Sequence, residues 1–497
     1  MPHAADQILT AAQMRAAEEE LIAAGISVDE LMQIAGRGAA EWVWRITAHR
    51  AVTVLCGPGN NGGDGYVIAE ALRERGCKVV VVAATEPKTD VARKARALYR
   101  GEVLPTDHLP KGDVLVDCLF GSGLTRPLSE DHAALLNRLA ASHSWRVAVD
   151  VPSGIECDSG ILLNAGLPSF DLTVALGAWK FAHFLMPASA TMGALRLVPI
   201  GVEPLAGAAA RLARPSLSIP AADAHKYRRG LLAVIGGAMP GAALLSAEAA
   251  QGAGAGYVKL LPGMGSAHPS TSSGRADLGK KPAHPEPVEG RAPTLAPPDL
   301  VIDSRPLSEA LLDSRLNALL IGPGLGRDGQ ARERLADALA ADIPAVLDAD
   351  ALVLLGSQQL AARTAPLIVT PHEGELAALE RAFDLDGNGS KPQRTLALAR
   401  AGRMVVVAKG SDTVIAAPDG RLTCAPRASS WLSVAGTGDV LAGAIASRLA
   451  TGADPFAAAC EGVWLHGEAA RLAPPAFSAA MLAATIRSAY AAACEPD

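Results

Sequence analysis

Aromatic residues are scarce in this sequence and make up 4% of its 497 residues. The cores must therefore be built from alanine, valine, isoleucine and leucine, as those of parallel α/β layers usually are. Hydrophobic residues account for 49% of the chain and charged residues for 19%, which excludes wholesale disorder. At roughly 100–200 residues per domain, the length predicts two to four domains.

Paired cysteines, basic clusters and long apolar runs are also lacking. The seven cysteines are scattered and form no C-x-x-C pair, which argues against a zinc site or disulfide framework and suits a reducing compartment. A net charge of -6 without a Lys/Arg-rich run gives no reason to expect nucleic-acid binding. The first 20 residues lack the basic and apolar regions of a signal peptide, and glycines interrupt the uncharged run at 230–247. We therefore expect a cytoplasmic protein that does not bind membranes.

Short apolar runs alternate with alanine-rich helical stretches through both halves of the chain. This alternation predicts parallel βαβ units and hence an α/β fold class. The expected strands are 52–56, 79–84, 114–120, 147–152 and 172–177 in the first half, and 231–237, 257–261, 318–324, 344–350, 367–375, 404–410 and 413–418 in the second. We expect the last of these to form a hairpin with the sequence GRL at one edge of the sheet.

Two segments interrupt this alternation. Residues 201–223 are rich in alanine and proline and show no convincing strand, so we place the domain boundary there, giving domains 1–213 and 214–497. Residues 262–298 are rich in proline, glycine and serine and lose apolar periodicity. They predict a solvent-exposed, disordered insertion.

The first dense motif is GPGNNGGDG at 57–65, between an expected strand and a helix expected over Gly65–Glu74. Its glycines let the backbone approach a ligand, and the start of the helix favours a phosphate. The G-x-G-x-x-G spacing alone is weak evidence, because glycine-rich turns are common. An Asx-rich turn that caps the helix explains the motif about equally well.

Two more motifs place carboxylates after expected strands. Asp117 precedes a glycine-rich turn whose Arg126 can bind a phosphate through two hydrogen bonds. Asp150 ends another strand and is a candidate general base. A helix cap or salt bridge would also explain Asp117, and a turn-stabilising role would explain Asp150. Because ligands of open α/β sheets bind at the carboxyl ends of the strands, the three loops should converge at one edge.

The motifs GPGNNGGDG, DCLFGSGLTRP and VDVPSG resemble the signatures of the NAD(P)H-hydrate epimerase family, over about residues 10–210. The resemblance implies a Rossmann-like three-layer domain in which Asp150 contacts the hydrated nicotinamide and accepts a proton. It implies K⁺ binding by Asn61, Asp117 and Ser153, whose oxygen atoms suit a hard cation. The implied substrate-binding residues are Asn60, Asn61, Gly62, Gly63, Asp64, Gly121, Ser122, Gly123, Leu124, Thr125, Arg126, Pro127 and Asp150.

The second half contains an Ala-Gly-Thr-Gly-Asp motif at 435–439 that opens an expected helix. Consecutive backbone N–H groups at a helix start bind anions, and Asp439 can take a proton from an attacking hydroxyl, which is what phosphoryl transfer requires. An aspartate favoured by the helix dipole explains the bare motif equally well. The sequence KGSDT at 409–413 ends a strand and can engage nucleotide phosphates, which favours phosphoryl chemistry.

Other turns in this half are less specific. The glycine-rich turn at 236–241 is by itself better explained by close helix packing, and a lone histidine such as His372 is more often structural than catalytic. Glu373 and Glu375 beside it are suited to orienting a ligand or its magnesium ion.

Together, GGAMPGAALL, IGPGLG, LDADAL, TPHEGE, AKGSDTVIA and AGTGDVLAG resemble the ADP/ATP-dependent NAD(P)H-hydrate dehydratases of the ribokinase-like superfamily, over about residues 223–490 apart from the insertion. The resemblance implies that Asp439 faces the substrate hydroxyl and that the fused enzyme uses ADP with Mg²⁺, as a homo-oligomer. The implied hydrate contacts are Ala243, Gly324, His372 and Asp439, and the implied ADP contacts are Lys409, Gly410, Ser411, Asp412, Thr413 and Gly438.

The two resemblances imply one repair function for hydrated NADH and NADPH (NADHX and NADPHX). The first domain would interconvert the R and S epimers, with Asp150 as acid and base. The second would dehydrate the S epimer with ADP, yielding NAD(P)H, AMP and phosphate. A small-molecule kinase is an alternative for the second domain, although TPHEGE and the fused NNGGD motif count against it. A non-catalytic binding module is an alternative for the first, although Asp150, Asn61 and Asp117 are all present.

Overall fold

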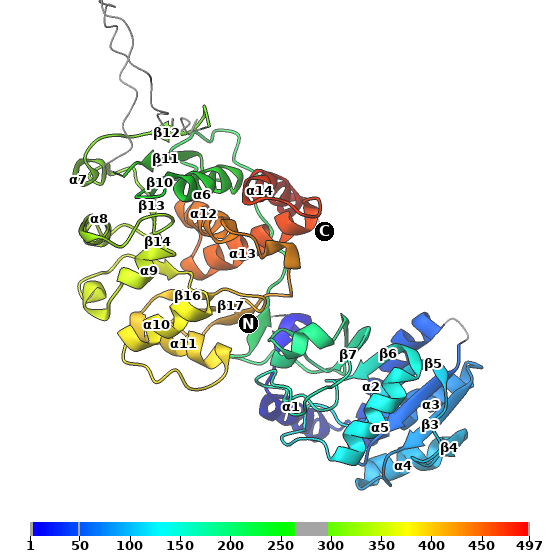
Figure 1. Ribbon diagram of the computed structural model, residues 1–497. Helices are drawn as coiled ribbons and strands as arrows, with labels where there is room; N and C mark the ends of the chain where they lie inside the picture. Colours follow the sequence, from blue (N-terminus) through cyan, green and yellow to red (C-terminus); the bar gives the residue numbers. More distant parts are fainter. Residues whose placement is uncertain (1–2, 48–49, 264–296, 496–497) are drawn as a thin grey trace, which may run out of the picture. The chain divides into compact units, whose positions relative to one another are not determined.

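The computed structural model describes residues 3–47, 50–263 and 297–495, so most of the expected insertion lies outside the described residues (Figure 1). The chain forms two compact units. Unit 1 comprises residues 1–213, 388–397 and 408–427, and unit 2 comprises 214–387, 398–407 and 428–497. Both units contain parallel strands alternating with helices, which confirms the α/β fold class.

The main sheet of unit 1 has seven parallel strands in the order β4-β3-β2-β5-β6-β7-β8. The five strands expected from the sequence are present, and β4 and β8 were missed because neither is a continuous buried apolar run. The order reverses between β2 and β5, and such a reversal is where Rossmann-like folds bind their ligands. The strands are β2 (Val52–Cys56), β3 (Val79–Ala83), β4 (Glu102–Leu104), β5 (Gly112–Cys118), β6 (His143–Val149), β7 (Leu172–Leu176) and β8 (Ala194–Val198).

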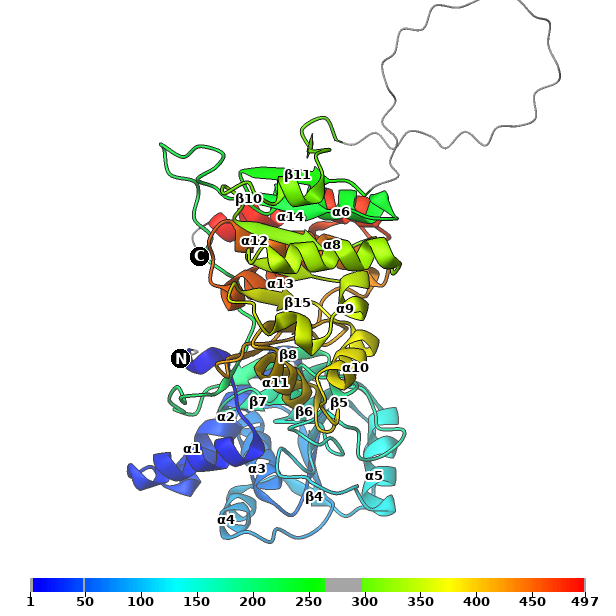
Figure 2. The same ribbon diagram turned by 90° about the vertical axis from the view of Figure 1, so that its left-hand side faces the viewer.

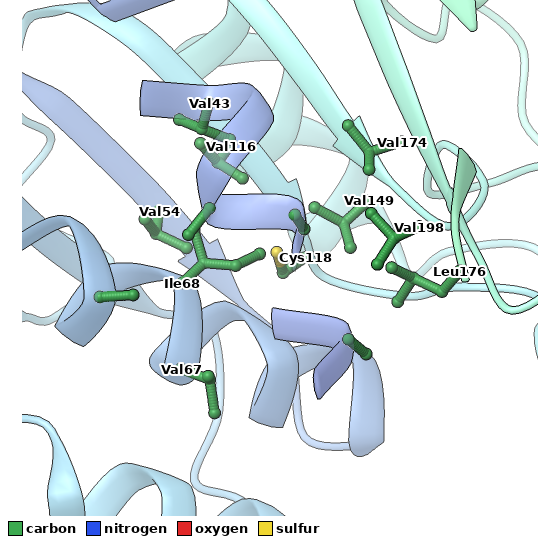
Figure 3. Close-up of a cluster of buried hydrophobic side chains, with 14 of the residues drawn as sticks. Val43, Val54, Val67, Ile68, Val116, Cys118, Val149, Val174, Leu176 and Val198 are labelled. Atoms are coloured by element: carbon green, nitrogen blue, oxygen red, sulfur yellow. The ribbon is translucent and has the colours of Figure 1, made fainter. Parts of the chain in front are cut away.

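Helices cover both faces of this sheet, giving the expected three layers. Val54 of β2 packs into the core beneath α2 (Val28–Thr47), α3 (Asn60–Glu74) and α4 (Asp90–Leu98). The next residue, Leu55, packs on the other face with Leu136 of α5 (Glu130–Ala141), because side chains alternate along a strand. Figure 3 shows the first of these cores, which includes Val43 of α2 and Val116 of β5.

Helix α3 begins five residues earlier than the sequence suggested. We expected a loop over the NNGGD motif and a helix from Gly65, but the helix begins at Asn60. The glycines permit close packing at this end: a β-carbon on Gly62 would lie 1.9 Å from the carbonyl oxygen of Gly57. Glycine has a low helix propensity, which is why composition misplaced the start. The motif therefore presents the first helical turn, with its free N–H groups, at the switch point.

Unit 1 also contains a small group of paired strands. β17 (Val414–Ala416) and β18 (Leu422–Cys424) form the expected antiparallel hairpin. The expectation that it lies at a sheet edge is wrong, because β9 (Ala209–Arg211) pairs with β18 and β1 (Gln7–Ile8) pairs with β9. The boundary stretch 201–223 thus contains a strand, which was missed because three residues are too few to show a period.

Among the described residues before 214, one further helix is long and the other helical segments are short. The longer helix is α1 (Ala11–Ala23), which begins with a capping box at Thr10. The remaining segments are η1 (Ala4–Asp6), η2 (Phe181–His183) and η3 (Ala188–Thr191).

Unit 2 is built on parallel strands in the order β12-β11-β10-β13-β14-β15-β16. The expected strands are present but mostly shorter, because the glycine-rich residues that follow them belong to the loops. The order again reverses, here between β10 and β13. The strands are β10 (Leu231–Ile235), β11 (Tyr257–Leu261), β12 (Val301–Ile302), β13 (Ala318–Ile321), β14 (Ala345–Leu347), β15 (Leu367–Val369) and β16 (Val405–Ala408).

Two layers of helices flank the sheet of unit 2 (Figure 1). One layer contains α6 (Pro240–Gly252), α12 (Thr437–Ala450), α13 (Pro455–Leu472) and α14 (Ala479–Cys494). The other, which faces the viewer in Figure 2, contains α8 (Gly329–Ala340), α9 (Asp350–Leu354) and α10 (Glu373–Ala382). The remaining helices are α7 (Leu307–Ala310), α11 (Lys391–Gly402), η4 (Ser357–Leu360) and η5 (Ser430–Leu432). Within the described parts of the chain, the helices are too short or too polar to span a membrane.

Helices α6 and α12 pack so closely that a side chain between them would collide with backbone. A β-carbon on Gly443 would lie 2.1 Å from the carbonyl oxygen of Ser246. Hydrogen bonds join the same helices, from Ser246 Oγ to the carbonyl oxygen of Asp439 (2.9 Å) and from Ser447 Oγ to that of Ala250 (2.8 Å).

Gly443→Ala is therefore expected to destabilise the protein. Overpacking costs about 1–3 kcal/mol, and alanine's helix propensity returns at most about 1 kcal/mol. The urea midpoint followed by circular dichroism should fall. Gly329→Ala in α8 is the matched control, because a β-carbon there meets nothing within 4 Å. An unchanged midpoint for Gly443→Ala would contradict the account of this contact.

Candidate active sites

A cavity of about 680 Å³ lies in unit 1 at the loops that follow β2, β5 and β6. It brings together the three segments that were expected to converge at one edge of the sheet, which confirms that prediction. The residues of the predicted site that line it are Asn60, Asn61, Asp64, Gly121, Ser122, Gly123, Leu124, Thr125, Arg126 and Asp150. Gly62, Gly63 and Pro127 belong to the same segments but do not line it, and Gly62 and Gly63 are buried in α3.

Asp150 is held in place from several directions. Its backbone has a positive φ of 66°, which non-glycine residues rarely adopt. The backbone N–H of Ser122 donates to Asp150 Oδ2 at 2.9 Å, and His183 Nε2 lies 2.8 Å from the Asp150 carbonyl oxygen. Such strain is typical of residues whose side chain must point in one particular direction.

The decisive partner of Asp150 is Lys180, which the sequence analysis missed. Its Nζ atom forms an ion pair with Asp150 Oδ1, and it also donates to the carbonyl oxygen of Leu176 at 2.6 Å. Lys180 is only 1% exposed, although lysine is almost never fully buried unless it is paired. The available signal was a lysine in the mostly apolar segment AWKFAHF after β7.

The ion pair fixes the charge of Asp150. Burial by itself would raise the pKa of the Asp150 carboxyl group. The charge of Lys180 and the hydrogen bonds from Lys180 and Ser122 outweigh burial and hold the pKa below its usual range. Asp150 is therefore a carboxylate at neutral pH.

His183 joins the backbones of these two residues. Its Nδ1 atom accepts a hydrogen bond from the Lys180 backbone N–H at 2.9 Å. Burial and the nearby charge of Lys180 lower the pKa of His183 to about 4, so the ring is neutral. A neutral ring that accepts at Nδ1 carries its proton at Nε2, which then donates to the Asp150 carbonyl oxygen.

The residues expected to bind potassium form two groups. Ser153 donates to Asp117 through its backbone N–H (3.0 Å) and its Oγ (2.8 Å), and Asp117 also accepts from the Leu119 N–H (3.1 Å). Burial raises the pKa of Asp117, and these hydrogen bonds lower it in part. Asn61, in contrast, has a buried side-chain amide whose nitrogen and oxygen have no hydrogen-bond partner among the described residues.

Gly121 lies between Asn61 and Asp150. A β-carbon on Gly121 would be 3.0 Å from Asp150 Oδ2 and 3.2 Å from Asn61 Oδ1. An unpartnered buried amide is costly, because desolvation is not repaid by a hydrogen bond. The site therefore offers polar groups of Asn61 to a ligand or an ion.

In unit 2, Asp439 is the third residue of α12 and is half-buried. Gly436 precedes the helix with a φ of 92°, and Asp439 Oδ2 lies 3.9 Å from the position of a β-carbon on this glycine. His466 Nε2 lies 2.9 Å from the carbonyl oxygen of Thr437 and ties the turn to α13. The G-T-G-D sequence thus forms the helix start that the sequence predicted.

The two loops at the switch point of unit 2 are hydrogen-bonded to each other. The Met239 N–H donates to the Gly324 carbonyl oxygen at 2.9 Å, and Gly324 has a φ of 64°. A β-carbon on Gly324 would lie 2.2 Å from the Met239 carbonyl oxygen, so glycine is required there. Ala243 is fully buried in α6. A β-carbon on Gly236 would lie 3.7 Å from the β-carbon of Ala243.

His372 has a structural role at the start of a helix. It caps α10: its Nδ1 atom accepts from the N–H groups of Gly374 (3.0 Å) and Glu375 (3.2 Å). Glu375 Oε2 accepts in return from the His372 N–H at 2.8 Å. The imidazole is exposed, so the capping role leaves a face of the ring open to solvent.

The predicted nucleotide loop, residues 409–413, belongs to unit 1. Lys391 Nζ lies 2.6 Å from Asp412 Oδ1 and also donates to the Asp412 carbonyl oxygen at 2.8 Å. Thr413 Oγ1 donates to the carbonyl oxygen of Gly410 at 3.1 Å. Lys391 adds a cation to this loop from α11, and no local motif indicated it.

The chain thus joins a Rossmann-like α/β unit to a second parallel α/β unit, and each has a carboxylate at a helix start or strand-end loop. The NAD(P)H-hydrate dehydratase family matches residues 232–491, and the family described as YjeF-related protein N-terminus matches residues 28–182. The chain belongs to the bifunctional NAD(P)H-hydrate repair enzyme family.

Relatives with this family name match the chain along nearly its whole length. The bifunctional NAD(P)H-hydrate repair enzyme of Salinibacter ruber is 33% identical, over 93% of this chain and 91% of its own length. The enzyme of the same name from Gloeobacter violaceus is 34% identical, over 93% of this chain and 92% of its own. A solved ADP/ATP-dependent NAD(P)H-hydrate dehydratase from Bacillus subtilis, crystallised with ATP/Mg²⁺, is 26% identical over 56% of this chain and 95% of its own, with a TM-score of 0.45.

Proposed function

We propose that this protein repairs hydrated NADH and NADPH in two steps. The domain of residues 1–213 interconverts the R and S hydrates. The domain of residues 214–497 converts the S hydrate and ADP into NAD(P)H, AMP and phosphate. One observation supports the proposal above all. A single chain of this family contains both a carboxylate–lysine pair in a cavity at the strand ends and a helix that begins with Gly-Thr-Gly-Asp.

Asp150 is the base of the epimerase. The hydrate carries a hydroxyl group on C6 of its reduced nicotinamide ring, and epimerisation requires that a proton leave and return to that hydroxyl. A carboxylate kept ionised by Lys180 and oriented by Ser122 is suited to this proton transfer. Residues 60–64 at the start of α3 and the loop of residues 121–127 bind the dinucleotide. Arg126 and the N–H groups at the start of α3 bind its phosphates.

We propose that Asn61, Asp117 and Ser153 hold a potassium ion. The unpartnered Asn61 amide and the buried Asp117 carboxyl group are oxygen donors, which a hard cation prefers. A bound cation would satisfy Asn61 and offset the burial of Asp117. When bound, the ion would supply positive charge that fixes the loops of the substrate site.

If this assignment is right, replacing K⁺ by tetramethylammonium should lower the epimerisation rate several-fold, because the larger ion has no room among these donors. Asn61→Leu should lower the rate in K⁺ and abolish the response to the exchange. The rate is measured as R-to-S conversion without ADP. Equal rates of the unaltered protein in both salts would contradict the potassium site.

Asp439 is the base of the dehydratase. It takes the proton of the C6 hydroxyl, whose oxygen attacks the β-phosphate of ADP and releases AMP. In the phosphorylated hydrate the C6–O bond then breaks, phosphate leaves with that bond's electrons, and a proton is lost from C5. The C5=C6 double bond that forms gives NAD(P)H. Backbone N–H groups at the start of α12, including that of Gly438, stabilise the transferred phosphoryl group, and Mg²⁺ would neutralise phosphate charge.

The remaining predicted residues surround this chemistry. Ala243, Gly324 and His372 contact the hydrate, the first two through backbone at the switch point. Residues 409–413, reinforced by Lys391, bind ADP. The protein acts on small molecules in the cytoplasm as a homo-oligomer, without a nucleic-acid or membrane partner. The negative net charge supports the absence of a nucleic-acid partner.

The test uses a mixture of both hydrate epimers with Mg²⁺ and excess ADP. Absorbance of NADH should recover completely, in a fast phase for the S epimer and a slower phase for the R epimer. Recovery of about half would leave the first domain without epimerase activity. Phosphate transfer to another alcohol without recovery of NADH would identify a small-molecule kinase instead.

A further inference from the structure

We propose that Asp64 is the general acid of the epimerase, acting opposite the base Asp150. This inference rests on the epimerase function proposed above and deepens it, because resemblance assigns Asp64 only to substrate binding. Asp64 lies in α3, and Asp150 follows β6. Both carboxyl groups line the same cavity of about 680 Å³.

The placement of Asp64 is unusual for a carboxyl group that only supports the fold. The residue is 8% exposed, and the small exposed remainder lines the cavity. Among the described residues, none forms a hydrogen bond or an ion pair with its side chain. Buried carboxyl groups are normally paired, because an unpaired charge is expensive to desolvate. Asp64 therefore presents an uncharged carboxylic acid, with its proton, to whatever fills the cavity.

The two carboxyl groups are held in opposite protonation states. Burial, together with the negative charges of Asp150 and Glu18, raises the pKa of Asp64 well above its usual range, and Lys180 offsets only part of this rise. Asp150 is ionised by its contact with Lys180. Two acids whose surroundings separate their pKa values in this way form an acid–base pair.

Epimerisation at C6 requires both members of such a pair. Asp150 removes the hydroxyl proton, the C6–O bond becomes a carbonyl, and the C6–N1 bond breaks with its electrons moving to N1. Asp64 gives its proton to N1. Rotation about C5–C6 presents the other face of the carbonyl carbon, and N1 attacks it. The proton on N1 returns to Asp64 and that on Asp150 returns to the oxygen, so no other reagent is consumed.

Among the described residues, few charged groups line the cavity with Asp64, and the thiols of Cys56 and Cys118, whose pKa values burial raises, are titratable groups near it. From α1, Glu18 and Arg15 line the cavity. Arg126 lines it from the loop after β5, and Lys180 with Asp150 completes the set. Burial also raises the pKa of Glu18, while Lys180 lowers it and Asp150 raises it.

The experiment follows conversion of the separated R hydrate to the S hydrate by the full chain without ADP, so that dehydration does not occur. Asp64→Asn keeps the size of the side chain but has no acidic proton, so kcat should fall by about 10²–10⁴-fold with little change in KM. Asp113→Asn makes the same substitution in a side chain that accepts the Ala51 N–H away from the cavity lining, and it should keep the full rate. Repair of the S hydrate with ADP confirms that each variant retains an active second domain.

The pH profile separates an acid from a binding residue. In the unaltered protein, kcat should fall as pH rises through the raised pKa of Asp64, because the ionised group cannot donate. That alkaline limb should vanish in Asp64→Asn. A raised KM with unchanged kcat, or an unaltered protein whose rate lacks the alkaline limb, would overturn the assignment. If the unaltered protein does not interconvert the epimers at all, the epimerase function itself fails.

Discussion

Lys180→Met is expected to lower epimerisation by about 10²–10⁴-fold at neutral pH, the loss typical of a disabled general base. Lys180 is 1% exposed and is the cation that keeps Asp150 ionised inside the protein. Methionine has a similar length but no charge. Burial would therefore raise the pKa of Asp150 without the opposing effect of the Lys180 charge. The carboxyl group would then hold its proton at neutral pH and could not accept another.

The direction of the pH effect follows from the same contact. In the unaltered protein the pKa of Asp150 lies below its usual range, so the base is ionised throughout the neutral range. In Lys180→Met the acidic limb of the rate profile should move to higher pH. R-to-S conversion as a function of pH measures this shift. Lys180→Arg keeps the charge and should retain more activity than Lys180→Met at neutral pH. A neutral-pH rate for Lys180→Met equal to that of the unaltered protein would contradict the role given to the pair.

Asp439→Asn is expected to abolish repair of the S hydrate while epimerisation continues. Asparagine preserves the shape of the third residue of α12 but cannot take the proton of the substrate hydroxyl. Removal of a general base costs about 10²–10⁴-fold in rate. Production of NADH from the S hydrate with ADP measures the loss, and R-to-S conversion without ADP measures the activity that should remain.

The control must remove the same charge from another helix start. Asp454 caps α13 and accepts from the N–H groups of Phe456 and Ala457 at 3.1 Å. Asp454→Asn should retain dehydration, because asparagine also caps helices. Repair by Asp439→Asn at the full rate would show that another group takes the proton.

The strands were predictable from sequence because both main sheets are parallel and covered on both faces. Their strands are continuous apolar runs, such as VTVLC at β2, which is buried at every position. The loops after β2, β5 and β6 were also expected to meet, since parallel strands place their carboxyl ends at one edge. Exposed or very short strands, such as β8 and β9, carry no such signal.

Partners contributed from distant segments could not be predicted. Lys180 follows Asp150 by 30 residues, and no spacing rule links a strand-end carboxylate to a lysine after the next strand. The start of α3 was misplaced because its packing against Gly57 overrides the low helix propensity of glycine. The role of His372 as a helix cap likewise depends on contacts with Gly374 and Glu375.

Strand β9 bears on how this polypeptide can be divided. A truncation after Ala213 would keep β9 but remove β18, to which β9 pairs in parallel. The shortened product would display a row of unsatisfied main-chain donors and acceptors, and such edges recruit other chains into aggregates. Although the sequence places the domain boundary at residue 213, a recombinant protein that ends there would need another segment to pair with β9 in place of β18. Without it, we expect the protein to aggregate.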